Sequence, residues 1–150
     1  MAKVAIGCDP NAVDLKEVLR RHLVELGHEV EDFGSDDPVY ANTAIRVAEA
    51  VAAGTHNRGV LLCGTGIGVS ISANKVAGAY AALVADPYSA ERAQKSNNAN
   101  IICMGSQTTG AEVAKYLLSI FMGSEYSPGG RSEPKIQRIY DYEREHSERP

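Results

Sequence analysis

The stretch from residue 61 to residue 75, LLCGTGIGVSISANK, joins an apolar strand pattern, a glycine turn and a helix pattern that starts near Ile67. The strand pattern ends at Cys63, and the turn contains Gly64, Gly66 and Gly68. Glycines permit a tight turn and leave the amide N–H groups open, while the helix directs its positive end to the same place. This order predicts a parallel sheet unit with an anion-binding pocket, where the helix end favours a thiolate at Cys63.

The glycine spacing does not identify the ligand. It reads G-x-G-x-G, and Val69 occupies the position where the dinucleotide-binding pattern G-x-G-x-x-G requires its last glycine. The spacing also differs from the phosphate loop G-x-x-x-x-G-K-[ST]. The turn therefore needs further residues before it indicates a function.

Strand and helix patterns alternate along the chain. Strands are expected at residues 3–8, 28–34, 59–63, 79–85 and 101–104, each followed by a helix pattern, with Asn11 and Asp14 near the first helix start and Asp86 and Pro87 at the fourth. This alternation predicts an α/β fold with a five-stranded parallel sheet, strand order 2-1-3-4-5, and helices on both faces. Ligands bind such sheets where the winding reverses, between strands 1 and 3, which is where Asp9 and Cys63 fall.

The C-terminal segment is set apart by composition. Residues 123–134 form a turn-rich linker, and a last helix carries Ile136, Ile139 and Tyr140 on one side. With 150 residues the chain is expected to form one domain, and the segment of about 124–150 to dock on its own domain or on a neighbouring subunit.

Composition excludes several classes of function. A net charge of -4 argues against a general nucleic-acid or anionic-membrane binder. No segment approaches the ~18 apolar residues of a membrane span, and three cysteines without a pairing pattern indicate a reducing compartment, so a cytoplasmic protein is expected. The histidines lack metal-ligand spacing, which argues against a metal site; they are His22, His28, His56 and His146.

Five motifs together identify a resemblance over nearly the whole chain. They are GCD at 7–9, CGTGIGVSISANK at 63–75, DPYSAERA at 86–93, SNNAN at 96–100 and GGR at 129–131. The chain resembles the family of ribose-5-phosphate isomerase B and galactose-6-phosphate isomerase. The resemblance implies a flavodoxin-like three-layer fold with an extra C-terminal helix, and a homodimer or dimer of dimers with shared active sites. It also implies interconversion of a phosphorylated aldose and ketose through an enediolate, with no metal or cofactor.

The resemblance further implies roles for individual residues. Cys63 matches the family's catalytic base, and Thr65 with the amides of Gly66 to Gly68 matches its oxyanion and hydroxyl contacts. Arg131 and Lys135 match a phosphate clamp that the neighbouring subunit donates. The other expected substrate-binding residues are Asp9, Gly64, Ser96 and Asn97.

Each of these residues also has a purely structural interpretation. Cys63 could be a small buried side chain like Cys8 and Cys103, and Asp9 could cap a turn. Thr65 could cap the helix. The asparagines of residues 97–100 are typical turn formers, and Arg131 and Lys135 could be ordinary solvated charges.

Four departures from the family pattern bear on the substrate. Pro10 and Ser96 stand where pentose-phosphate members usually carry histidines, Asp36-Asp37-Pro38 replaces Asp-Tyr-Pro, and Gln107 replaces a common arginine. The resemblance implies that the first histidine helps to hold phosphate and the second helps to open the sugar ring.

Loss of a ring-opening group favours an open-chain substrate. A tetrose 4-phosphate has no hydroxyl left to close a five-membered ring, so erythrulose 4-phosphate to erythrose 4-phosphate isomerisation is expected. Ribose 5-phosphate isomerisation and a non-catalytic sugar-phosphate sensor are the alternatives. A redox switch at Cys63 lacks a resolving cysteine at C-x-x-C spacing.

Overall fold

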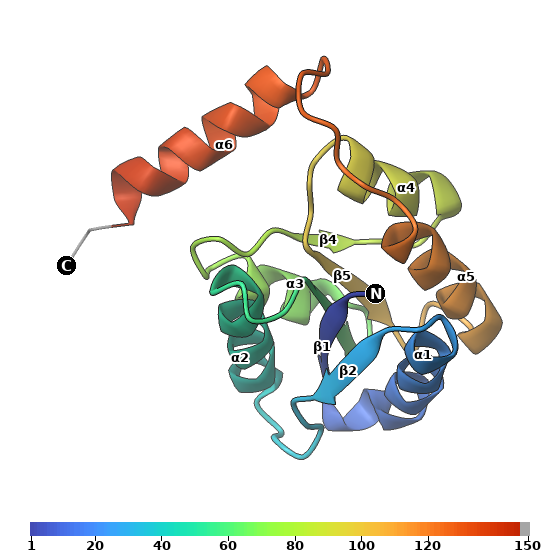
Figure 1. Ribbon diagram of the computed structural model, residues 1–150. Helices are drawn as coiled ribbons and strands as arrows, with labels where there is room; N and C mark the ends of the chain where they lie inside the picture. Colours follow the sequence, from blue (N-terminus) through green and yellow to red (C-terminus); the bar gives the residue numbers. More distant parts are fainter. Residues whose placement is uncertain (148–150) are drawn as a thin grey trace.

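The computed structural model describes residues 1–147, which form a parallel sheet flanked by helices (Figure 1). The strands are β1 (Lys3–Cys8), β2 (Glu29–Asp32), β3 (Arg58–Cys63), β4 (Ala81–Leu83) and β5 (Ile101–Gly105). The helices are the short η1 (Pro10–Ala12), α1 (Val13–Glu25), α2 (Tyr40–Ala52), α3 (Ile67–Ala73), α4 (Pro87–Lys95), α5 (Ala111–Met122) and α6 (Glu133–His146). Within residues 1–147, no helix is both long and apolar enough to cross a membrane.

The strand order is β2-β1-β3-β5-β4, so the predicted fold class is confirmed but the predicted order of the last two strands is wrong. Every residue of β5 is buried, whereas β4 has only three residues and none of them is fully buried. A strand that is apolar along its whole length belongs inside a parallel sheet that is covered on both faces. β5 therefore pairs with β3, and β4 forms the edge.

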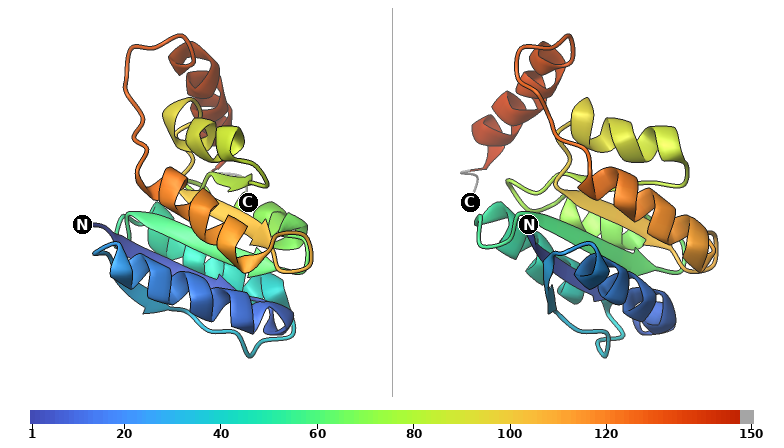
Figure 2. Two further views of the ribbon diagram at one scale, coloured as in Figure 1. Left: turned by 90° about the vertical axis from the view of Figure 1, so that its right-hand side faces the viewer. Right: turned by 45° about the vertical axis from the view of Figure 1, so that its right-hand side comes forward.

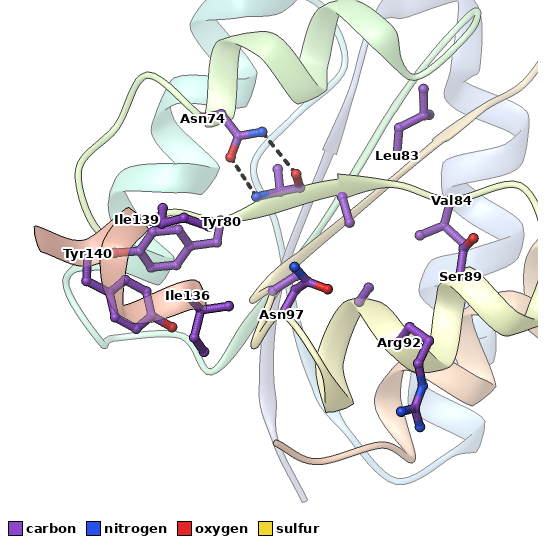
Figure 3. A pocket seen from close by; sticks show the side chains of 14 residues that line it. Asn74, Tyr80, Leu83, Val84, Ser89, Arg92, Asn97, Ile136, Ile139 and Tyr140 are labelled. Atoms are coloured by element: carbon purple, nitrogen blue, oxygen red, sulfur yellow. Dashed lines mark hydrogen bonds between the residues drawn. The ribbon is translucent and has the colours of Figure 1, made fainter. Parts of the chain in front are cut away.

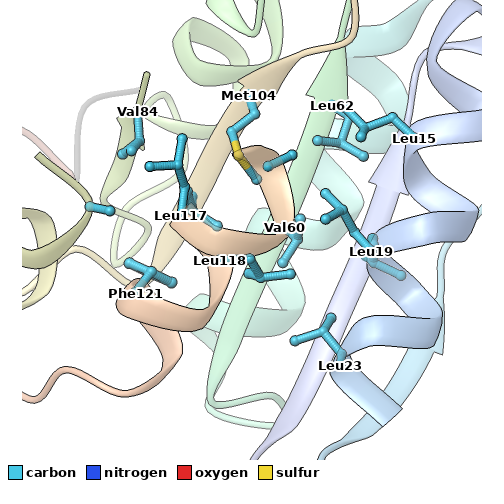
Figure 4. Packing of buried hydrophobic residues seen from close by; sticks show 14 of the residues in the cluster. Leu15, Leu19, Leu23, Val60, Leu62, Val84, Met104, Leu117, Leu118 and Phe121 are labelled. Carbon is cyan, nitrogen blue, oxygen red and sulfur yellow. The ribbon is translucent and has the colours of Figure 1, made fainter. Parts of the chain in front are cut away.

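Helices lie on both faces of the sheet (Figure 2), and alternate residues of β1, β3 and β5 enter two separate cores. One core lies under α1, α4 and α5, and the other lies under α2 and α3. Figure 4 shows the first core, in which leucines of α1 and α5 pack on residues of β3 and β5; those labelled are Leu15, Leu19, Leu23, Val60, Leu62, Met104, Leu117, Leu118 and the neighbouring Val84 and Phe121. Cys63 belongs to the second core, because the side-chain alternation directs it toward α2 and α3.

The helix starts follow the expected chemistry at α4 but not at α1. Asp86 caps α4 by accepting a hydrogen bond from the amide of Ser89 at 2.8 Å, and Pro87 follows as the first helical residue. At the first helix, Asp14 lies in the first turn of α1 and Asn11 in η1 directly before it, as expected, but neither side chain caps the helix. Asp9 caps η1 through the amide of Asn11, and α1 continues from η1 without a side-chain cap.

α6 lies apart from the layers, at the end of the linker 123–132 (Figure 1). Glu143 of α6 accepts hydrogen bonds from the amide of Gly78, at 3.1 Å, and from the hydroxyl of Tyr80. The ring of Tyr140 lies 5.1 Å from that of Tyr80, and its hydroxyl accepts from Asn98. Polar and aromatic contacts therefore hold α6 on the loop before β4.

The apolar side of α6 is only partly covered. Ile136 is 3% exposed, whereas Ile139 on the next turn is 51% exposed. The helix thus packs on its own domain and keeps apolar surface free. Docking of residues 124–150 on a neighbouring subunit stays a prediction, and residues 148–150 lie outside the described part of the chain.

Candidate functional site

The carboxyl ends of β1 and β3 bring Asp9 and Cys63 to one place. Cys8 pairs with Leu62 across the two strands, and the amide of Asp9 donates to the carbonyl of Leu62 at 2.9 Å. Asp9, directly after β1, therefore lies beside Cys63, the last residue of β3. The structure places both residues where the winding of the sheet reverses, as their sequence positions predict.

The glycine turn after Cys63 depends on Gly66. Gly66 has φ 80°, in the left-handed region, and begins α3. A Cβ there would lie 2.6 Å from Leu83 and 2.9 Å from the backbone of Met104. Gly66 thus meets both a conformational and a steric requirement, and it lets the turn pack directly on β5.

Two amides of the turn hold the two candidate catalytic side chains. The N–H of Gly66 donates to Sγ of Cys63 at 3.1 Å, and the N–H of Ile67 donates to Oγ1 of Thr65 at 3.2 Å. The first amides of a helix have no acceptor inside the helix, and at the start of α3 these two side chains supply one for the amides of Gly66 and Ile67. The amide of Gly66, expected as an oxyanion contact, orients the sulfur here.

Cys63 differs from the other two cysteines in its surroundings. Burial raises the pKa of Cys8 to about 11, against a smaller lowering by the charge of Lys16. Burial also raises the pKa of Cys103. Both remain thiols at neutral pH and pack as small apolar side chains, which agrees with the sequence expectation. Cys63, at the start of the glycine turn, is 6% exposed, whereas the other two cysteines are fully buried.

A second group of expected site residues lies around the end of α4 and the start of α6. Ser96 and Arg131 line one hollow of about 500 Å³, together with Arg92 and Lys95 of α4. Asn97 lines an adjacent, more apolar hollow of about 400 Å³ between β4, α4 and α6 (Figure 3). Lys135 is exposed in the first turn of α6.

These two groups of residues lie at opposite ends of the strands. Residues 96–100 precede β5, and the carbonyl of Asn100 accepts from the amide of Gly59 near the start of β3. Cys63 ends β3. At about 3.3 Å per residue, the two ends of β3 are on the order of 17 Å apart. One chain therefore brings Asp9, Cys63 and Thr65 together, and Ser96 and Arg131 together, but does not join the two groups.

A comparison with known protein families assigns the chain. Residues 4–139 match the ribose/galactose isomerases. The chain belongs to the ribose/galactose isomerase family. The match spans both groups of site residues up to the middle of α6.

Individual relatives are similar over almost their whole length. A D-erythrulose-4-phosphate isomerase of Pectobacterium atrosepticum is 44% identical over 147 residues, which cover 95% of this chain and 96% of that protein. The ribose-5-phosphate isomerase B of Escherichia coli is 42% identical, over 93% of this chain and 95% of that one. The structure of Clostridium thermocellum ribose-5-phosphate isomerase B superposes with a TM-score of 0.90 at 35% identity, covering 96% of this chain and 99% of the other.

Two of the asparagines in this isomerase-family chain have structural roles. Asn98 adopts φ 52° after α4, and Asn100 accepts from the amide of Tyr80 and donates to the carbonyl of Gly78. Asn100 thus connects the turn before β5 to the loop before β4, and the left-handed conformation of Asn98 agrees with its interpretation as a turn former. Among the described residues, no cluster of three or more histidine, cysteine or acidic side chains could hold a metal ion.

The structure adds two residues that sequence patterns missed. Tyr40, at the start of α2, lies so close to Gly68 that a Cβ there would be 2.4 Å from its ring. Arg92 contacts Ser96 one turn later on α4. The spacing from Arg92 to Ser96 was a usable signal, because residues four apart share a helix face. Nothing in the sequence predicts the contact between Tyr40 and Gly68, since it joins two helices.

Replacing Gly66 with alanine should destabilise the protein by about 1–3 kcal/mol, because residue 66 has φ 80° and its Cβ would lie 2.9 Å from the backbone of Met104, which cannot move aside as a side chain can. Gly64→Ala is the matched control in the same turn, since its Cβ would meet only Cγ of Gln107 at 3.7 Å. Urea unfolding measures both. Equal losses in the two glycine variants would contradict this packing.

Proposed function

We propose that the protein is an aldose–ketose isomerase of a small phosphorylated sugar. The observation that carries the proposal is the placement of Cys63, whose sulfur is held by the amide of Gly66 beside Asp9 and Thr65. Membership of the ribose/galactose isomerase family supports it. The reaction needs a base and oxyanion donors within one pocket, and this edge of the sheet provides both.

The chemistry proceeds by proton transfer between neighbouring carbons. The thiolate of Cys63 takes the proton from the carbon beside the carbonyl group, and the electron pair of that C–H bond forms the enediolate. Thr65 and the amide of Gly68 stabilise the negative charge on oxygen. The thiol then returns the proton to the former carbonyl carbon, while the hydroxyl proton moves from its own oxygen to the former carbonyl oxygen, so that the new carbonyl group forms at the carbon that lost its proton. Asp9 binds a sugar hydroxyl and keeps the substrate in register.

The complete site requires two chains. The second group of residues lies at the end of the sheet where the strands begin, whereas Cys63 lies where β3 ends; the group contains Ser96, Asn97 and Arg131. In this proposal a second copy of the chain supplies that group. The flank around β4 carries exposed apolar side chains that suit an interface; they are Ile67, Ile71, Leu83 and Tyr88. This separation supports the proposal of a homodimer, or a dimer of dimers, in which Arg131 and Lys135 of one subunit hold the phosphate of the substrate bound at Cys63 of the other.

We infer that the substrate is a tetrose phosphate, with erythrulose 4-phosphate and erythrose 4-phosphate as the pair interconverted in the cytoplasm. Unlike a histidine, Ser96 does not take up and release a proton near neutral pH, so it cannot act as the acid–base group that opens a sugar ring. An open-chain substrate needs no such group. The relative that is 44% identical carries the same substrate in its name. The ribose-5-phosphate isomerase B at 42% identity keeps ribose 5-phosphate as the second candidate.

Purified protein should convert D-erythrulose 4-phosphate with a higher kcat/KM than D-ribose 5-phosphate. Ring opening adds a step for the pentose that this chain has no histidine at position 96 to assist. Steady-state assays of both substrates at the same pH measure the ratio. A preference for ribose 5-phosphate would show that another group opens the ring, and the tetrose assignment would be abandoned.

Cys63→Ala should fold normally and lose orders of magnitude in kcat/KM, since the base is removed. A loss of less than about tenfold, or ~1.4 kcal/mol, would exclude Cys63 as the base. Cys8→Ala is the control: its side chain is buried under α1, on the opposite face of the sheet, and it should keep its activity. Tight binding of sugar phosphate without turnover in the wild-type protein would favour the sensor function.

Mixed dimers test the shared site. A Cys63→Ala subunit combined with an Arg131→Ala subunit forms one intact site and one doubly defective site, so activity should recover to about half of the wild-type value per dimer. Each homodimeric variant serves as its own control. Absence of recovery in purified heterodimers would mean that both residues act on the same substrate from one chain.

A further inference from the structure

Arg92 and Ser96 form a hydrogen-bonded pair on one face of α4 and its C-terminal cap. Nη1 of Arg92 donates to Oγ of Ser96 at 3.3 Å, and Nη2 donates to Oε1 of Glu91 at 2.9 Å. Figure 3 shows the guanidinium directed away from the apolar hollow at Leu83 and Val84. The guanidinium group of Arg92 therefore lies at the neighbouring polar hollow, which Ser96 also lines.

The polar hollow carries more positive than negative side chains. Arg92, Lys95 and Arg131 line it, against the carboxylates of Glu125 and Glu133. Glu133 is engaged by the amide of Gly129 at 2.7 Å. The group that contains Arg131 thus already includes a second arginine, which the family resemblance did not indicate.

The guanidinium of Arg92 is held by its two terminal nitrogens. Its Nε is buried and has no hydrogen-bond partner among the described residues. A buried donor without an acceptor is costly, and such costs concentrate at sites where a side chain is placed for function. In this position the guanidinium group lies between Glu91 and Ser96 and donates a hydrogen bond to each.

The pair has a defined chemical character. A guanidinium stays charged and can only donate, so Oγ of Ser96 must accept from it. The serine hydrogen is then available for a different acceptor. A serine held in this way can donate to a sugar oxygen, but it does not take up a proton near neutral pH.

We propose that Arg92 is a positioning and specificity-determining residue of the isomerase site, which fixes Ser96 as a neutral hydrogen-bond donor to an oxygen of an open-chain sugar phosphate. The inference rests on the proposed function and extends it to a residue pair. The pair selects against ring-forming sugars, because opening a hemiacetal ring requires a group that accepts the ring hydroxyl proton.

A double-mutant cycle tests the pair on D-erythrulose 4-phosphate. Arg92→Met and Ser96→Ala should each lower kcat/KM about tenfold, and the double variant should be little worse than either, because both changes remove one interaction. Arg92→Lys keeps a cationic donor and should recover part of the activity. Arg20→Met is the matched control, since Arg20 is an ion-paired arginine on α1, bonded to Glu17 at 2.6 Å.

Stability is measured alongside by urea unfolding, so that a folding defect is separated from a catalytic one. If Arg92→Met does not fold, Arg92→Gln replaces it in the cycle, because glutamine keeps a donor of shorter reach and is expected to retain partial activity. Independent, multiplicative losses in the double variant would overturn the inference. Unchanged kcat/KM in a folded Arg92 variant would also overturn it.

The outcome also separates this inference from the proposed function. If the wild-type protein converts no sugar phosphate, the proposed function fails and the pair has no role in it. If the wild-type protein is an active isomerase that prefers D-ribose 5-phosphate, the isomerase function stands, the tetrose assignment fails, and the selective role of Arg92 and Ser96 is wrong.

Discussion

The direct packing of the glycine turn on β5 is the constraint on which the candidate site depends. Gly66 adopts a left-handed conformation with no space for a side chain between it, Leu83 and the backbone of Met104. In this position its amide reaches the sulfur of Cys63 at 3.1 Å. The packing of Gly66 on β5 therefore also orients Cys63, the candidate base. Fold stability and site geometry are coupled through Gly66.

The parallel sheet also decides how the site is divided. Because every strand runs in the same direction, residues that follow strands lie at one end of the strands, and residues that precede strands lie at the other end. Asp9 and Cys63 follow strands, whereas Ser96 precedes one and shares its hollow with Arg131. A sugar phosphate that contacts both groups has to bind between two copies of the chain, and this requirement links catalysis to assembly in the function proposed here.

Local patterns predicted most of the elements, because strand and helix periodicity and capping are properties of neighbouring residues. The glycine turn, the capping of α4 by Asp86 and the buried runs of β1 and β3 follow from short segments. The order of β4 and β5 did not follow, since it depends on which strand gains more by lying inside the sheet. Chain order alone contains no such comparison, and the predicted order of these two strands was wrong.

The sequence by itself determined the α/β class, the family, and the chemical identity of the site residues, because these depend on residue type and spacing. Only the tertiary structure decided which of those residues meet. It placed Tyr40 on Gly68, and it separated Cys63 from Arg131. The physical reason is that distances between elements come from helix packing and sheet order, which sum many weak contacts over the whole chain and leave no local pattern.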